Sequence, residues 1–197
     1  MNDISTLDRA TRIVAGDDGT TYDSVAISLH WATALLVIVQ FASAISWDYF
    51  SKDTREAMQG VHVSLGVLLT ILIVARIVWR LIPGHQLPSL EVGWIRALSK
   101  GVHYLFYLLL VAQAVTGFMW RWAQGHPVSL FGLPIPGPYG ALDRATRHTL
   151  KDIHEKVGWG IVILAAGHAA AALYHHYRLH DRVLGRMFPP ARRSEAA

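Results

Sequence analysis

Long uncharged apolar windows alternate with short polar connections along the chain. Four windows without Asp, Glu, Lys or Arg are also predominantly apolar and poor in Pro: residues 24–47, 57–75, 101–120 and 157–177. A helix needs about 20 apolar residues to cross the hydrocarbon core of a bilayer, and every window has roughly that length. The helices of a soluble bundle would carry polar residues at helical spacing, which these windows almost entirely lack. The pattern therefore predicts an all-α integral membrane four-helix bundle.

The connections between the windows predict a single domain with no internal repeat. The Pro83–Gly84 pair is expected to stop the second helix. The longest connection begins with the Gly- and Pro-rich segment GHPVSLFGLPIPGPYG and ends with residues that can start the fourth helix. The expected parts are a transmembrane domain at 24–178 and two tails, at 1–23 and 179–197.

Composition and charge narrow the class of protein and its topology. The chain is 52% hydrophobic and contains no cysteine, which excludes disulfides, Fe–S clusters, thiolate-bound haem and covalent c-type haem. The net charge of +4 reflects topology, and we expect no nucleic-acid partner. Lys and Arg are enriched in the tails and the middle connection, so the positive-inside rule predicts that both termini are cytoplasmic.

Four histidines within the predicted helices fall at two depths. His154 and His168 are 14 residues apart on one helix, which places them on one face and about 21 Å apart along its axis. His62, near the outer start of the second helix, matches the depth of His154, and His30 matches that of His168. Two imidazoles from facing helices complete a six-coordinate b haem. The pattern therefore predicts two haem sites in the bundle, His62 with His154 and His30 with His168.

Small and basic residues near these histidines fit the same interpretation. Gly66 and Gly158 each follow a histidine by four residues, so each lies one turn deeper on the same face. There they would let a flat macrocycle approach the backbone, or would simply permit close helix packing. Arg76, Arg80 and Arg121 end helices and are candidates to pair with haem propionates, or are interfacial residues that set topology.

Other uses of the histidines remain open at this point. A lone membrane histidine often makes only a hydrogen bond in packing. A proton pathway usually recruits carboxylates, which the windows lack, and a zinc or copper site would gather three or four ligands at one depth. His103 competes with His30 as a ligand or contacts a propionate or quinone. His175 and His176 are expected at the inner interface, in supporting roles.

The chain resembles the prokaryotic cytochrome b561 family, in its short four-helix, two-haem form, from about Tyr22 to Pro190. The matching stretches are ISLHW (27–31), GVHVSLG (60–66), RIVWRL (76–81), DIHEKVGW (152–159) and GHAAAALYHHY (167–177). The resemblance implies two b haems, with His30 and His168 holding the inner one and His62 and His154 the outer one. It also implies a multi-pass protein of the bacterial inner membrane that moves electrons between the periplasm and ubiquinone.

The resemblance leaves three functions to weigh. One family member oxidises superoxide and reduces ubiquinone, and the compact chain favours this stand-alone superoxide oxidase activity. The alternative is an electron-conducting subunit for a periplasmic or membrane dehydrogenase or hydrogenase, which would add a redox protein to the lipid and quinone partners. A haem-handling or sensing protein is the third. Candidate quinone contacts are Trp31, His103 and Tyr107.

A basic stretch at the outer start of the fourth helix bears on this choice. Arg144, Arg147 and Lys151 lie there, and Arg121 is expected nearby. Such a basic mouth above an outer haem would steer a small anion such as superoxide towards it. The alternative is an ordinary solvated start of an amphipathic helix.

Overall fold

Four long helices make up most of the computed structural model, which describes residues 21–82, 93–181 and 183–188. They are α2 (Ser24–Ser46), α3 (Lys52–Leu81), α4 (Gly93–Ala123) and α5 (Arg144–Tyr174). Short helical turns η1 (Trp47–Tyr49) and η2 (His175–Leu179) extend α2 and α5, and η3 (Gly185–Met187) follows. All four helices are long and apolar enough to cross a membrane, which confirms the predicted membrane four-helix bundle. The expected stop at Pro83–Gly84 and most of both expected tails lie outside the described residues.

Helices α3 and α5 begin before their uncharged windows, and the first turn of each is capped by a side chain. Asp143 precedes α5, and its Oδ1 accepts the backbone N–H of Thr146 at 2.9 Å. Ser51 caps α3 in the same way through the N–H of Thr54. Side-chain oxygens at this position satisfy donors that have no partner within the helix. Each of these helices therefore begins with one or more charged turns that precede its apolar segment.

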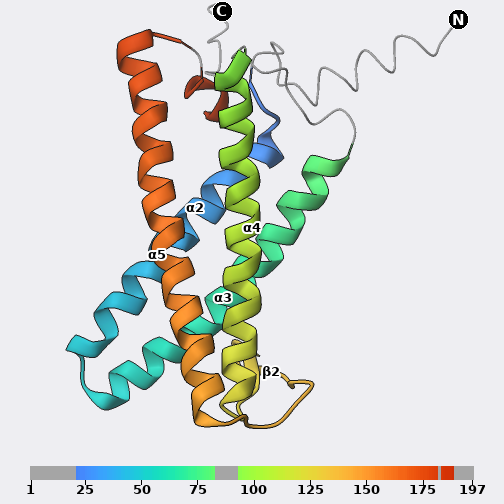
Figure 1. The fold of residues 1–197 in the computed structure, drawn as a ribbon, viewed down its shortest axis with the longest axis vertical. Coiled ribbons are helices and arrows are strands. Elements are labelled where there is room, and N and C mark those ends of the chain that lie inside the picture. The colour runs from blue at the N-terminus through green and yellow to red at the C-terminus, as the bar shows by residue number, and fades with distance from the viewer. Residues whose placement is uncertain (1–20, 83–92, 182, 189–197) are drawn as a thin grey trace, which may run out of the picture.

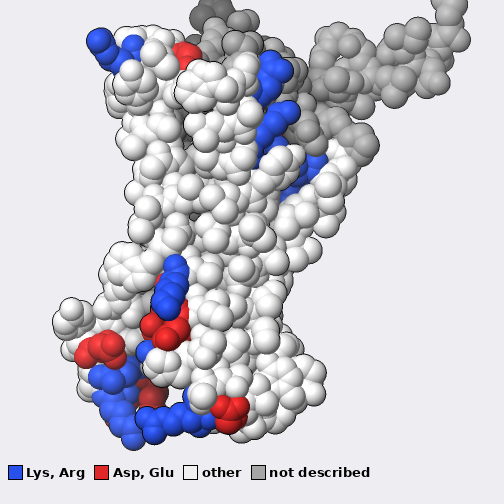
Figure 2. Space-filling model, viewed as in Figure 1, with Lys and Arg blue, Asp and Glu red and all other residues white. Residues whose placement is uncertain are grey.

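The helices form two antiparallel pairs (Figure 1). α2 packs along α3, and α4 packs along α5, while contacts between the pairs run mainly through α3 and α4. We call the end where α2 and α4 finish and α3 and α5 begin the hairpin end, and the opposite end the distal end. Lys, Arg, Asp and Glu gather at these two ends and leave an uncharged band between them (Figure 2), as expected for a surface in contact with lipid.

A small β-hairpin closes the hairpin end within the Gly- and Pro-rich connection. Strands β1 (Val128–Leu130) and β2 (Leu133–Ile135) are antiparallel, and the two turn residues between them, Phe131 and Gly132, have φ of 47° and 96°. Two positive φ angles are typical of a two-residue turn that matches strand twist. Ser64 of α3 holds the hairpin, since its Oγ lies 3.1 Å from Ser129 O and accepts the Phe131 N–H at 3.1 Å.

A cluster of buried apolar side chains lies at mid-height in the bundle. Leu69, Ile73, Leu110 and Ile161 form this cluster. By sequence position on α3 and α5, the cluster lies between the histidine near each helix start and the distal residues Arg76 and His168. It therefore separates two interior regions, one towards each end of the bundle.

Candidate functional site

The structure brings the predicted histidines together in two layers. His62 of α3 and His154 of α5 lie within electrostatic range of each other in the layer near the hairpin end. His30 of α2 lies within range of His168 of α5 in the distal layer, which also contains His103 and Arg76. All four predicted ligands are partly buried. That they bind haem stays a prediction, since the geometry shows their pairing but not what they hold.

A serine from α2 orients the ring of His62. Ser43 Oγ lies 3.1 Å from His62 Nδ1 and donates its own proton to the Gln40 carbonyl at 2.8 Å. A hydroxyl has one proton, so Ser43 must accept the hydrogen bond from Nδ1–H. The tautomer assigned from this network leaves the lone pair on His62 Nε2, which is the atom that binds a metal when Nδ1–H is hydrogen-bonded.

A threonine from α4 orients His154 in the same way. Thr116 Oγ1 lies 3.3 Å from His154 Nδ1 and donates to the Ala112 carbonyl at 2.7 Å. His154 Nε2 therefore also carries a lone pair, and the Gln113 carboxamide N–H satisfies it at 3.1 Å. The layer near the hairpin end thus presents two imidazoles in the ligating tautomer, and ligation by His154 would displace the Gln113 N–H from its Nε2.

The two helix pairs use corresponding positions, although the sequence shows no obvious repeat. Adding 73 to positions in α2 and 92 to positions in α3 gives the residues that make the equivalent contacts in α4 and α5. The matched contacts include Ser43 or Thr116 on Nδ1 of the histidine, and Trp47 or Trp120 against its ring. The full set pairs His30 with His103, Gln40 with Gln113, Ser43 with Thr116, Trp47 with Trp120, His62 with His154, Gly66 with Gly158 and Arg76 with His168.

Glutamine side chains occupy the space above the two predicted glycines. A Cβ at Gly66 would lie 3.1 Å from Gln40 Nε2, and one at Gly158 would lie 3.3 Å from Gln113 Nε2. The glycines therefore admit a neighbouring carboxamide in this structure, a use that the sequence did not suggest. Gly117 of α4 was also missed: its Cβ would come within 3.0 Å of the His154 ring, so a glycine there lets the ring approach α4.

The distal layer is organised differently around His30. Arg76 Nη2 donates to His30 Nδ1 at 3.0 Å, and its guanidinium lies 5.8 Å from the centre of the Tyr107 ring. Arginine has no acceptor, so this contact places the lone pair of His30 on Nδ1 and the proton on Nε2. Ligation of a metal through Nε2 would require a change in that hydrogen bond or in the proton. The distal layer is therefore the less preorganised of the two for a haem.

His103 lies against His168 rather than apart from the site. The two rings are 5.5 Å apart at their centres, and Phe106 contacts the His168 ring at the same distance. His103 Nδ1 is 2.7 Å from the Ser99 carbonyl, so it carries the proton that it donates there. His103 and Tyr107 thus lie in the distal layer, as expected for two of the candidate quinone contacts.

The third candidate quinone contact and the paired histidines lie at the distal end. Trp31 donates from Nε1 to the Met187 carbonyl at 2.8 Å and so holds η3. His175 pairs with Asp181, and His176 contacts the ring of Tyr177. These contacts fix the position of the residues that follow α5.

The residues fit a flat macrocyclic ligand better than a bare metal ion. In the described part of the chain, no group of three or more His, Cys, Asp or Glu could hold a metal ion. The side-chain oxygens of Gln40 and Gln113 are buried with no hydrogen-bond partner among the described residues. Both oxygens belong to side chains that contact the layer of His62 and His154. A haem offers no hydrogen-bond donor to these oxygens, so the fit of the site to a macrocycle rests on the paired imidazoles.

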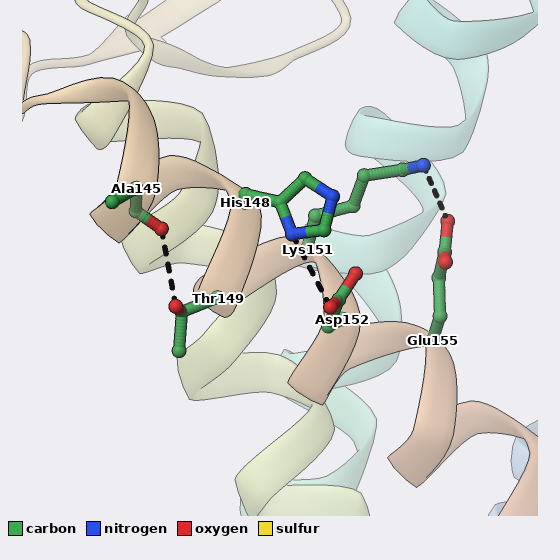
Figure 3. Close-up of polar contacts among 6 residues, drawn as sticks. All are labelled: Ala145, His148, Thr149, Lys151, Asp152 and Glu155. Carbon is green, nitrogen blue, oxygen red and sulfur yellow. Dashed lines mark hydrogen bonds and ion pairs between the residues drawn. The ribbon is translucent and has the colours of Figure 1, made fainter.

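The basic residues predicted to bind or steer anions have varied surroundings. Arg80 lies one turn beyond Arg76, and Arg121 donates from Nε to the Pro127 carbonyl at 3.3 Å. Arg144 is exposed at the start of α5. Lys151 lies 3.2 Å from Glu155, and His148 lies 3.3 Å from Asp152 (Figure 3), so acidic residues offset part of the positive field.

Comparison with known proteins agrees with this membrane helical fold. The model of the prokaryotic cytochrome b561 family matches residues 21–190. A cytochrome b561 homolog 2 from Escherichia coli K12 is 30% identical over 84% of this chain and 90% of its own length. A probable superoxide oxidase CybB from Yersinia pestis is 31% identical over 87% of this chain and 97% of its own length. The four-helix membrane bundle described here belongs to the prokaryotic cytochrome b561 family.

Proposed function

We propose that the protein is a di-haem cytochrome b that carries electrons across the membrane between the periplasm and ubiquinone. The family implies b-type haem. The observation that carries the two-haem assignment is the pairing of histidines in two layers, with the Nε2 lone pairs of His62 and His154 presented by Ser43 and Thr116. In this proposal His62 and His154 ligate one haem, and His30 and His168 ligate the other.

The side chains of the bundle have separate tasks in this proposal. A bound b haem supplies a one-electron couple between ferric and ferrous iron. Ser43 and Thr116 fix the orientation of the two rings near the hairpin end. The apolar cluster around Leu69 and Ile161 excludes water from the region between the layers. The guanidinium of Arg76 places a positive charge in the distal layer, where an electron arriving from the other layer is stabilised.

Superoxide is the electron donor that we propose. Two superoxide ions lose one electron each to give two O2, and the two electrons with two protons convert ubiquinone to ubiquinol. The similarity to a probable superoxide oxidase supports this reaction, as does the exposed Arg144 at the start of α5. Quinone reduction is assigned to the distal layer because His103 and Tyr107 lie there beside His168 and Arg76.

The proposed placement is in the bacterial inner membrane, with both termini in the cytoplasm. The hairpin end, which carries β1 and β2, then faces the periplasm. The excess of Lys and Arg in the tails and middle connection supports this orientation.

A second function is favoured by the tip of the β-hairpin. Phe131 is 67% exposed and Leu133 is 69% exposed there. Exposed apolar side chains at a loop tip suit contact with another protein. In this alternative the chain conducts electrons for a periplasmic or membrane dehydrogenase or hydrogenase, and it reacts slowly with free superoxide.

Haem per chain and the reduced-minus-oxidised spectrum test the proposal on protein purified in detergent. We expect two low-spin b haems, with one lost or converted to high spin in His62→Ala and likewise in His168→Ala. His148→Ala is the matched control, because that histidine contacts Asp152 on the surface. No haem, or one haem insensitive to both substitutions, would contradict the proposal. Superoxide-driven quinone reduction no faster than that of the free reactants would favour the second function.

A further inference from the structure

Two arginines at the hairpin end each have one guanidinium nitrogen, Nε, that has no hydrogen-bond partner among the described residues. Arg55 of α3 and Arg147 of α5 each have an Nε that is shielded from solvent and makes no hydrogen bond within the described part of the chain. The two residues are 92 positions apart, which is the offset that relates His62 to His154. They are therefore corresponding residues of the two helix pairs.

Each arginine lies above one of the paired histidines. Arg55 precedes His62 by seven residues, and Arg147 precedes His154 by seven. Seven residues turn an α-helix to within about 20° of two full turns and raise it by about 10 Å. Each arginine is thus on the same face as its histidine, two turns nearer to the hairpin end. Both arginines therefore lie on the side of the histidine layer that faces the hairpin end.

Arg55 and Arg147 have different neighbours, but neither Nε is given an acceptor within the described ranges. Arg55 lies near Asp48, with Nη1 3.6 Å from Oδ1 and Nη2 3.4 Å from the backbone carbonyl. The Arg147 side chain makes no hydrogen bond or ion pair with the described residues, whereas Lys151 one turn later lies 3.2 Å from Glu155. Asp48 leaves the Nε of Arg55 unsatisfied, so the described residues supply an acceptor to neither Nε.

A buried cationic donor without an acceptor costs free energy. When the same atom is left unsatisfied at matched positions of two helices, a missing ligand is the simplest physical cause. Guanidinium groups prefer carboxylates and bind them with two parallel hydrogen bonds. Two such groups above one layer suit a ligand that has two carboxylates along one edge.

We propose that Arg55 and Arg147 bind the two propionates of the haem held between His62 and His154. This inference rests on the proposed function and deepens it by assigning the carboxylate contacts of that haem. Arg121, which the sequence suggested for this role, donates its Nε to the backbone carbonyl of Pro127. Arg55 was not singled out from the sequence because nothing in its surroundings there distinguishes it from a surface arginine.

The test compares haem with its dimethyl ester, which lacks both carboxylates. Haem-depleted full-length protein is reconstituted with each compound, and transfer of the bound compound to apomyoglobin is followed. The kinetic phase that is absent in His62→Ala reports on the site of His62 and His154, and its rate is compared between haem and the ester. Wild type should retain haem at least about tenfold longer than the ester, because charge-assisted hydrogen bonds are worth more than neutral ones. Arg55→Gln and Arg147→Gln should each increase the rate of haem loss. In the double variant, haem and the ester should be lost at equal rates.

The controls are Lys52→Gln and Lys151→Gln, which remove the same charge from the same helix starts. Their amines face Glu56 and Glu155, so both should leave the preference for haem over the ester unchanged. An undiminished preference in the double arginine variant would overturn the inference. If the double variant changed only the salt dependence of the reaction with superoxide, the arginines would serve a free anion and the inference would also fall. A wild type with fewer than two haems would instead contradict the proposed function.

Discussion

The hydroxyl oxygen of Ser43 lies 3.1 Å from Nδ1 of His62, across the interface between α2 and α3. The hydroxyl already donates to a backbone carbonyl of its own helix, so it can only accept from the ring. Thr116 repeats the arrangement for His154 in the other helix pair. Two neutral acceptors thus set the tautomer, and through it the basicity, of two proposed ligands.

Removing these acceptors should raise the reduction potential of the haem near the hairpin end. A hydrogen bond from Nδ1–H makes the imidazole a stronger donor, which stabilises ferric iron. Loss of a bond worth about 0.5–1.5 kcal/mol corresponds to about 20–60 mV for one electron. We expect this rise in Ser43→Ala and in Thr116→Val, measured by redox titration in detergent.

Ser46→Ala is the matched control, because Ser46 lies one turn further along α2 and bonds only the Ser43 carbonyl. Its potentials should equal those of wild type. Unchanged potentials in both Ser43→Ala and Thr116→Val would show that these hydroxyls do not act on ligands.

Substitution of Arg76 should lower the potential of the distal haem. Its guanidinium contacts His30 Nδ1 at 3.0 Å, and a nearby positive charge favours the reduced form of a haem. At an effective dielectric constant of about 20, a unit charge about 8 Å from the haem iron changes the free energy of reduction by roughly 2 kcal/mol, or about 90 mV. Redox titration of Arg76→Gln should show a decrease of this order in one of the two haems, while Arg76→Lys keeps the charge and most of the potential. A decrease confined to the other haem would contradict the assignment of Arg76 to the distal layer.

An added methyl group at Gly137 should destabilise the hairpin end. A Cβ there would lie 2.6 Å from Cγ and Cδ1 of Trp122, and Trp122 also donates to the Ile135 carbonyl at 3.2 Å. Overpacking of this kind costs about 1–3 kcal/mol. Gly137→Ala should therefore lower the thermal unfolding midpoint, followed by loss of the haem absorption. Gly140→Ala is the control, since its Cβ would have no atom within 4 Å, and an equal effect of both would rule out the clash as the cause.

The start of α5 should loosen at acidic pH. Hydrogen bonds from the Thr146 hydroxyl and N–H lower the pKa of Asp143 below its usual value of 3.8. A depressed pKa means that the stabilisation is complete above the unfolded value and is lost as the pH falls through the folded one. Amide hydrogen exchange, corrected for its intrinsic pH dependence, should show reduced protection at Thr146 below about pH 4. Asp143→Asn should remove this pH dependence while keeping the cap, and persistence of the dependence would point to another group.

The sequence was sufficient to predict the membrane bundle and the depth of each histidine. Both depend on local properties, because the length of an apolar stretch decides whether a helix can cross a bilayer, and 1.5 Å per residue decides where its side chains lie. Confirmed predictions of this kind include the helical start of α5 inside the longest connection. The β-hairpin was not predicted, because its short strands are held by Ser64, 65 residues before Ser129.

In the proposed site, too, some features could be predicted from the sequence and others depend on packing. His30, His62, His154 and His168 could be paired from the sequence because depth along a helix is a one-dimensional property. Their hydrogen-bond partners could not be assigned, since each comes from a different helix whose rotation about its axis is set by packing. The correspondence of the two helix pairs was hidden for a related reason: few residues are identical, and the loops between the matched positions differ in length.

The sequence by itself determined that this chain forms four membrane helices and carries histidines at two matched depths, because helix geometry and apolar length are properties of continuous segments. Only the tertiary structure decided which nitrogen of the His62 and His154 rings carries the proton, which arginine Nε atoms have no acceptor among the described residues, and that Gln40 and Gln113 lie over the two glycines. Those features depend on contacts between residues that are far apart in the sequence, such as Ser43 with His62 (19 positions) and Gln113 with His154 (41 positions). The packing of one helix against another brings such residues together.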